Sequence, residues 1–151
     1  MQRYTICEID LAAIRHNVGV MKAHIAGGAK FLAVVKADAY GHGAVPVAKA
    51  ALEAGADMLA VAIPEEGITL RHAGITAPIL VLGGIEEAAA RDVVQNGLTQ
   101  VVFDEARIRA LAQAGQALGE TAKVHLKLDT GMNRIGVRTE DEVKALVRLI
   151  D

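Results

Sequence analysis

Apolar and polar positions along the chain form two alternating kinds of segment. Short apolar runs are typical of strands buried on both faces, as in a parallel sheet. Longer stretches that carry one apolar stripe are typical of helices. The expected strands are Phe31–Val35, Met58–Ala62, Ile79–Leu82, Gln100–Phe103 and Val124–Leu128. The expected helices are Leu11–Ile25, Ala44–Ala54, Glu65–His72, Glu86–Gln95, Glu105–Leu118 and Glu140–Ile150.

The expected strands and helices alternate strictly, which predicts an α/β fold. Strand starts at residues 31, 58, 79, 100 and 124 are separated by 27, 21, 21 and 24 residues, a steady βα period. Such a series of right-handed βα units forms either an open doubly wound sheet or a (β/α)8 barrel. The pattern alone leaves both architectures open.

Lys36 follows the apolar run Phe31–Val35 directly and precedes a turn bracketed by Gly41 and Gly43. The C-terminal ends of parallel strands are where α/β proteins place their chemistry. A lysine at that edge can act as a nucleophile or a general base. A lysine that only ends the strand and reaches water is the alternative interpretation.

The last expected strand alternates apolar residues with ionisable ones, His125, Lys127 and Asp129. Because strand side chains alternate between faces, these three polar groups share one face. In a barrel wall, Leu126 and Leu128 would pack outward and the polar row would face the lumen. A solvated edge strand with one wet face is the alternative.

Composition argues against several classes of function. A formal net charge of -2 and 3% aromatic residues do not favour a nucleic-acid surface, which needs a basic patch. No apolar stretch approaches the roughly 20 residues that span a bilayer. The N-terminus lacks a secretory pattern, so a cytoplasmic location is expected and a membrane role is not.

Metal binding and disulfides are not expected either. Cys7 is the single cysteine, which excludes an internal disulfide framework and a cysteine zinc site. No His-Glu-x-x-His or similar ligand spacing occurs. Cys7 lies in the strand-like segment Tyr4–Ile9, so we expect a packed core thiol.

Three segments together resemble the pyridoxal-phosphate-dependent alanine racemases. Val34–Gly43 resembles their cofactor-attachment motif, Glu8–Asn17 their N-terminal signature, and His125–Gly136 their second internal motif. The resemblance implies the barrel rather than the open sheet. It also implies an N-terminal strand segment at 1–10, the N-terminal part of a cofactor-binding barrel at 11–151, and no C-terminal β domain.

Length makes that barrel incomplete, because a complete one takes about 250 residues. The 151 residues hold about five βα units and leave an open sheet edge that is prone to pair with another chain. We therefore expect a truncated fragment that is inactive alone, or a chain that gains strands from another copy.

The resemblance also implies roles for five residues. Lys36 would attach pyridoxal 5′-phosphate and move the proton at the α-carbon of alanine. Tyr40 would bond the cofactor phosphate, Leu82 would line its pocket, and Arg134 would donate to its ring oxygen. Lys127 stands at the place of a family lysine that is often carbamylated. Asn133 stands where the motif commonly has glycine, a mild departure because asparagine tolerates the left-handed backbone.

The implied activity is racemisation of L- and D-alanine, which supplies D-alanine for peptidoglycan, in a homodimer of the full-length protein. Two alternatives stay open. One is another barrel protein with the same cofactor, either a broad-specificity amino-acid racemase or a cofactor-homeostasis protein. The other is a non-catalytic fragment that associates with itself through its open edge.

Overall fold

The computed structural model describes residues 5–25 and 27–150, in which helices and strands alternate. The strands are β1 (Leu32–Val34), β2 (Met58–Val61), β3 (Ile79–Val81), β4 (Thr99–Val102) and β5 (Lys123–Leu126). The helices are α1 (Leu11–His24), α2 (Lys36–Gly41), α3 (Ala44–Glu53), α4 (Pro64–His72), α5 (Ala90–Gln95), α6 (Glu105–Leu118) and α7 (Glu140–Ile150), with a 3-10 turn, η1 (Glu87–Ala89), before α5. The five expected strands of the βα series and the expected helices form to within two residues, except that the helix expected at 86–95 is divided between η1 and α5.

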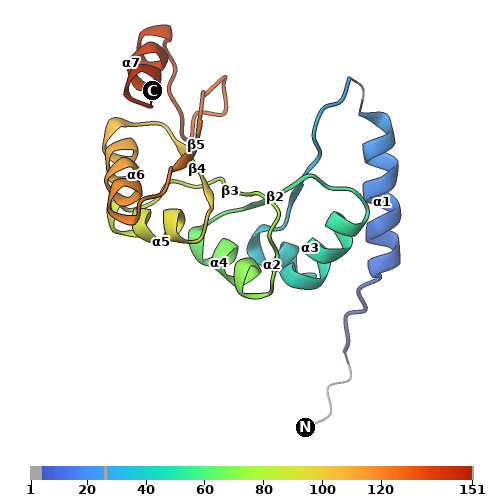
Figure 1. Ribbon diagram of the computed structural model, residues 1–151. Coiled ribbons are helices and arrows are strands. Elements are labelled where there is room, and N and C mark those ends of the chain that lie inside the picture. The colour runs from blue at the N-terminus through green and yellow to red at the C-terminus, as the bar shows by residue number, and fades with distance from the viewer. Residues whose placement is uncertain (1–4, 26, 151) are drawn as a thin grey trace.

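The five strands form one parallel sheet in the order β1-β2-β3-β4-β5. A doubly wound sheet reverses its strand order at a switch point. The sequential order here is that of a barrel wall, as the resemblance implied. Figure 1 shows the helices following the curved sheet along its outer side, from α1 to α7. The fold is therefore α/β, with part of a (β/α)8 barrel.

The main core lies between the sheet and the helices. Leu59, Ile79 and Val102 are fully buried there together with Leu70 of α4 and Leu111 of α6. Burial of one such side chain contributes roughly 1.5–3 kcal/mol to stability. This face holds the helices from α3 to α7 against the strands, whereas α1 packs through Val18 in a separate small cluster with Ala51 of α3.

A second, smaller apolar cluster covers the other face of the sheet. Its members come from the strands or their immediate ends and are Ala60, Leu80, Val101, Leu32, Leu82 and Phe103. Because no helix residue belongs to this cluster, it marks the concave side of the sheet, which corresponds to a barrel interior. None of the described helices is long and apolar enough to cross a membrane.

The N-terminal segment differs from the expectation. Tyr4 lies outside the described residues, and residues 5–10 have no strand or helix. Cys7 is exposed, so the expected packed thiol is wrong. Residues 5–10 pair with none of the described strands, and Asp10 at their end forms a helix cap instead. Asp10 accepts hydrogen bonds from the backbone N–H groups of Ala12 and Ala13 and caps α1.

Candidate active site

Lys36 lies at the C-terminal end of β1, where the sequence placed it. Val35 before it is 1% exposed, and its N–H donates to the carbonyl of Ala60 on β2 (2.8 Å). Lys36 itself is half-buried. Val34, two residues earlier, pairs with Ala60 of the concave cluster. The lysine therefore follows the strand at the edge where barrel enzymes hold their reacting groups.

The turn after Lys36 has an unusual backbone. Four consecutive residues, Ala37 to Tyr40, have φ between 51° and 56° and ψ between 37° and 51°, which is a left-handed turn of helix. For residues with a Cβ this conformation costs about 1–2 kcal/mol each. The sequence predicted a turn here but not its hand. Strain of this kind persists where surrounding contacts over-determine the structure.

Several hydrogen bonds hold the left-handed turn. The Ala39 N–H donates to the carbonyl of Val35 (2.9 Å), and the Gly43 N–H donates to that of Asp38 (2.9 Å). The Asp38 carboxylate accepts from the N–H of Ala44 at the start of α3 (2.6 Å). His42 Nδ1 lies 2.9 Å from the Ala39 carbonyl oxygen, a further contact within the turn.

The left-handed turn brings Tyr40 back beside Lys36. Lys36 Nζ lies 6.0 Å from the centroid of the Tyr40 ring, within reach of a cation–π contact. Tyr40 is 61% exposed, so both its ring and its hydroxyl are open to a ligand. An amine and a phenol thus stand together at one strand end.

Leu82 lies at the same edge, directly after β3. Its N–H donates to the carbonyl of Val61 (2.9 Å), and its half-buried side chain packs in the concave cluster with Leu80 and Phe103. Packing in this cluster accounts for Leu82 by itself. Leu82 also adds apolar surface to the concave face of the sheet, at the strand ends where Lys36 lies.

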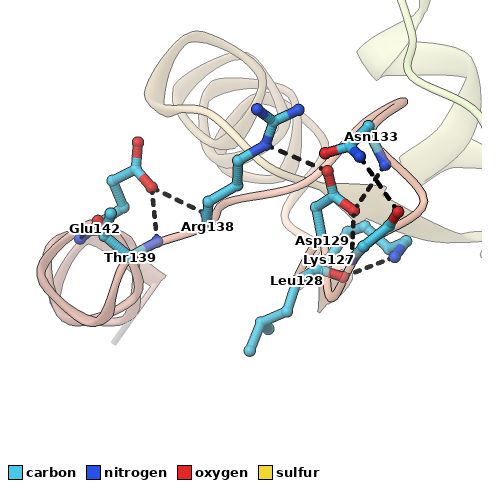
Figure 2. Close-up of polar contacts among 8 residues, drawn as sticks. Lys127, Leu128, Asp129, Asn133, Arg138, Thr139 and Glu142 are labelled. Atoms are coloured by element: carbon cyan, nitrogen blue, oxygen red, sulfur yellow. Dashed lines mark hydrogen bonds and ion pairs between the residues drawn. The ribbon is translucent and has the colours of Figure 1, made fainter.

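The loop after β5 is organised around Asp129, as Figure 2 shows. Its carboxylate accepts hydrogen bonds from the backbone N–H groups of Gly131 (3.1 Å) and Asn133 (3.0 Å), and from Arg138 Nε (3.1 Å). These two N–H groups hold the pKa of the Asp129 carboxyl below its usual range, Asn133 contributing most, and the charge of Arg138 adds to the effect. The turn that carries Arg134 is closed by this one carboxylate.

Two residues of the loop, Asn133 and Gly136, have positive φ angles that suit their residue types. Asn133 has φ 56°, so it takes the left-handed conformation that the family's glycine would serve. Gly136 has φ 122°, and a Cβ there would lie 2.7 Å from the Asp129 nitrogen. The Asp129 N–H can therefore donate to the carbonyl of Val137 (2.8 Å) as the chain returns.

The expected row of polar groups on the last strand is only partly observed. The strand ends at Leu126, which packs toward the helices as expected, whereas Leu128 is 46% exposed and does not. Lys127 Nζ donates to the carbonyl of Leu128 (2.6 Å). Arg134 is exposed and has no hydrogen bond or ion pair to the described residues. Asp129 turns into the loop, because Leu128 pairs with Val137 instead of continuing the sheet.

Sequence reasoning missed the residues that fasten these turns. Asp38, Glu66 and Arg138 were not singled out, although each binds backbone or carboxylate groups next to an expected site residue. The only sequence signal for Glu66 is its place two residues after Pro64 at a helix start, which is typical of a cap. Its contact with the Lys36 turn depends on the tertiary fold.

The geometry of these residues defines a class of site. A lysine and a phenol follow β1 of a barrel wall, an apolar side chain follows β3 two strands along, and an arginine follows β5. These side chains suit a planar, anionic ring that carries a carbonyl group, because a lysine amine can attack such a group.

Residues 9–151 match the family described as alanine racemase, N-terminal domain, and the chain belongs to that family. Members of this family use pyridoxal 5′-phosphate. The chain is 53% identical over 136 residues to an alanine racemase of Symbiobacterium thermophilum, covering 90% of this chain and 36% of the relative.

Solved structures agree in fold. The alanine racemase of Bacillus anthracis with bound L-Ala-P is 42% identical, with a TM-score of 0.91 over 99% of this chain and 39% of that chain. A histidine racemase of Leuconostoc mesenteroides is 34% identical, with a TM-score of 0.88 over 98% of this chain and 40% of that chain. The chain therefore spans less than half the length of these relatives.

Proposed function

We propose that this chain forms the first part of the barrel of an alanine racemase that interconverts L- and D-alanine with pyridoxal 5′-phosphate. The observation that carries the proposal is the pairing of Lys36 with Tyr40 across the left-handed turn, 6.0 Å from amine to ring. A strained turn at a strand end is typical of functional sites. The family membership supports the same conclusion.

Lys36 has two tasks in this proposal. Its amine would hold the cofactor covalently, and the same amine, when free, would remove or return the proton at the substrate α-carbon. When bound, the cofactor withdraws electrons from that carbon and makes its proton acidic. Lys36 is half-buried at the end of β1, and the left-handed turn after it restricts the backbone that carries its amine.

The other site residues would orient the cofactor. The exposed Tyr40 hydroxyl is free to donate to a phosphate oxygen, and Leu82 offers an apolar surface beside the ring. Arg134 would donate to the ring oxygen, since its charge is permanent and its fork is rigid. Carbamylation of Lys127 would replace its positive charge with a negative one and give Arg134 a partner. No metal ion is part of the proposal.

The family membership also supports a proposal for the oligomeric state and the cellular location. We propose a cytoplasmic homodimer at the length of the relatives, supplying D-alanine for peptidoglycan. Each edge strand, β1 and β5, pairs with a single neighbour among the described residues. We therefore propose that this chain needs further strands, from its own continuation or from another copy, before it racemises alanine.

A racemase for a different amino acid is the second candidate. The likeness to the histidine racemase, at 34% sequence identity, supports this candidate. The two alanine racemases have higher sequence identities, 42% and 53%, which favour the first candidate. Extending this chain with the downstream part of a matching alanine racemase, and following loss of optical rotation, separates the two. Turnover of alanine far above histidine supports the first, and the reverse supports the second.

Cofactor trapping tests the site directly. The chain is mixed with pyridoxal 5′-phosphate, reduced with borohydride and mapped by peptide mass spectrometry. We expect the modification on Lys36, its loss in Lys36→Arg, and no change in Lys49→Arg, an exposed lysine of α3. A label spread evenly over the surface lysines would contradict the proposal and favour a non-catalytic, self-associating chain.

A further inference from the structure

Glu66, on the first turn of α4, uses both of its carboxylate oxygens. Oε1 accepts a hydrogen bond from the backbone N–H of Ala37 (2.6 Å). Oε2 accepts from the N–H of Ala62 (2.6 Å) and, more weakly, from that of Ile63 (3.4 Å). Ala37 directly follows Lys36, and Ala62 directly follows β2. One carboxylate therefore joins the C-terminal ends of two neighbouring strands.

Helix capping explains only part of this arrangement. A glutamate at the third helical position commonly reaches back to the backbone N–H before its own helix, as Glu66 does to Ile63. The bond to Ala37 is different, because Ala37 is 29 residues away and belongs to the preceding βα unit. If Glu66 only capped α4, its Oε1 would be hydrogen-bonded to water and not to Ala37.

Packing fixes where Glu66 stands. Gly67, the next residue, faces Leu98, just before β4, and Ile79 of β3 so closely that a Cβ there would lie 3.0 Å from a Leu98 methyl and 3.5 Å from an Ile79 methyl. The missing side chain lets α4 approach the sheet. Glu66 is half-buried at the strand ends as a result. The packing of α4 therefore sets the distance of the Glu66 backbone from Ala37.

We propose that Glu66 is a positioning residue for Lys36. Ala37 is the first of the four left-handed residues, and its N–H is the only backbone donor of the turn that a side chain from another βα unit holds among the described residues. An ionised carboxylate makes roughly twice as strong a hydrogen bond as a neutral acceptor. Glu66 thus stabilises the strained turn that keeps the Lys36 amine beside Tyr40. This inference rests on the proposed function of Lys36.

Two readouts test this role on the 151-residue chain. The first is the ratio of borohydride-trapped cofactor on Lys36 to that on Lys49, which cancels general changes in reactivity. The second is amide hydrogen exchange at Ala37, which needs no cofactor. The variants are Glu66→Ala and Glu66→Gln, and the control is Glu65→Gln. Glu65 is exposed on the same helical turn, and its side chain has no hydrogen bond to the described residues.

We expect Glu66→Ala to lower the Lys36 to Lys49 ratio about tenfold and to speed exchange at Ala37 about tenfold, since a charge-assisted bond is lost. Glu66→Gln keeps one acceptor and should fall between Glu66→Ala and the unmodified chain. Glu65→Gln should leave both readouts unchanged. Circular dichroism confirms that each variant is folded, and Glu66→Gln replaces Glu66→Ala if the latter is not.

One result would overturn the role of Glu66, and a different one would overturn the proposed function. If Glu66→Ala or Glu66→Gln lowers only the thermal unfolding midpoint, with both readouts unchanged, Glu66 is a helix cap and the inference is overturned. If the unmodified chain shows no preference for Lys36, the proposed function fails instead. Exchange at Ala37 then decides alone whether Glu66 holds the turn.

Discussion

Arg138 Nε lies 3.1 Å from Asp129 Oδ2, an ion pair that joins the end of the last strand to the approach to α7. The two side chains differ sharply in exposure, because 61% of Arg138 is open to solvent and only 1% of Asp129 is. The carboxylate is covered by the turn that it closes. Its charge is balanced by one guanidinium and two backbone N–H groups. Asp129 is therefore the structural centre of the Arg134 loop.

Asp129→Asn should change the acid dependence of stability. The native carboxyl has a pKa below its usual value of 3.8, so the unfolded chain binds this proton at a higher pH than the folded chain does. The stabilisation is complete above about pH 4 and is lost as the pH falls through the lower native value. We expect the free energy of unfolding, measured by urea between pH 2 and 7, to fall less steeply below pH 4 in Asp129→Asn.

Arg138→Gln separates the two causes of that shift. It removes the guanidinium but leaves the N–H groups of Asn133 and Gly131, which contribute more to the lowered pKa of Asp129. Its acid profile should therefore stay closer to the unmodified chain than that of Asp129→Asn. An Asp129→Asn profile that overlays the unmodified chain would contradict this account.

Arg71→Ala should destabilise the end of the sheet opposite the site. The Arg71 guanidinium donates to the backbone carbonyls of Asn96, Ile75, Ala77 and Gly97, at 2.8–3.2 Å. Its loss leaves these acceptors without their donor, which should lower the free energy of unfolding by about 1.5–3 kcal/mol. Chemical denaturation measures the change. The control Arg91→Ala, at an exposed position of α5, should change the free energy of unfolding by no more than about 0.5 kcal/mol. Equal losses in the two variants would contradict a stabilising role of the Arg71 hydrogen bonds.

Ala37→Val should destabilise the chain although Ala37 is exposed. The residue has φ 51°, and a β-branched side chain is a true outlier in the left-handed region. We expect a loss of about 1–2 kcal/mol in the free energy of unfolding. Ala13→Val, at an exposed position of the right-handed helix α1, should lose no more than about 0.7 kcal/mol. Equal effects at the two positions would show that the turn is not left-handed in solution.

Cys7 should react as an open thiol in the folded protein. Its side chain is exposed in a segment without a partner strand. We expect one equivalent of 5,5′-dithiobis(2-nitrobenzoate) to react at the same rate with and without urea. Protection that disappears only on unfolding would restore the packed thiol expected from the sequence.

Local signals explain why most elements were predicted correctly. Apolar runs and their turn residues act over a few positions, so β2 and α6 start or end where the pattern indicated. Thr139 and Glu142 form the expected capping box, with reciprocal hydrogen bonds of 3.2 and 2.9 Å. Lys36 at a strand end was also predictable, because it needs only the strand and its order in the sheet.

The sequence by itself determined the βα series, the strand-end lysine and, through its motifs, the family. Only the tertiary structure decided the hand of the turn at Ala37–Tyr40, the reach of Glu66 to it and the pairing of Asp129 with Arg138. The physical reason is distance along the chain. Glu66 and Ala37 meet because α4 packs closely on β2 and β3, and no pattern within a few residues of either one encodes that contact.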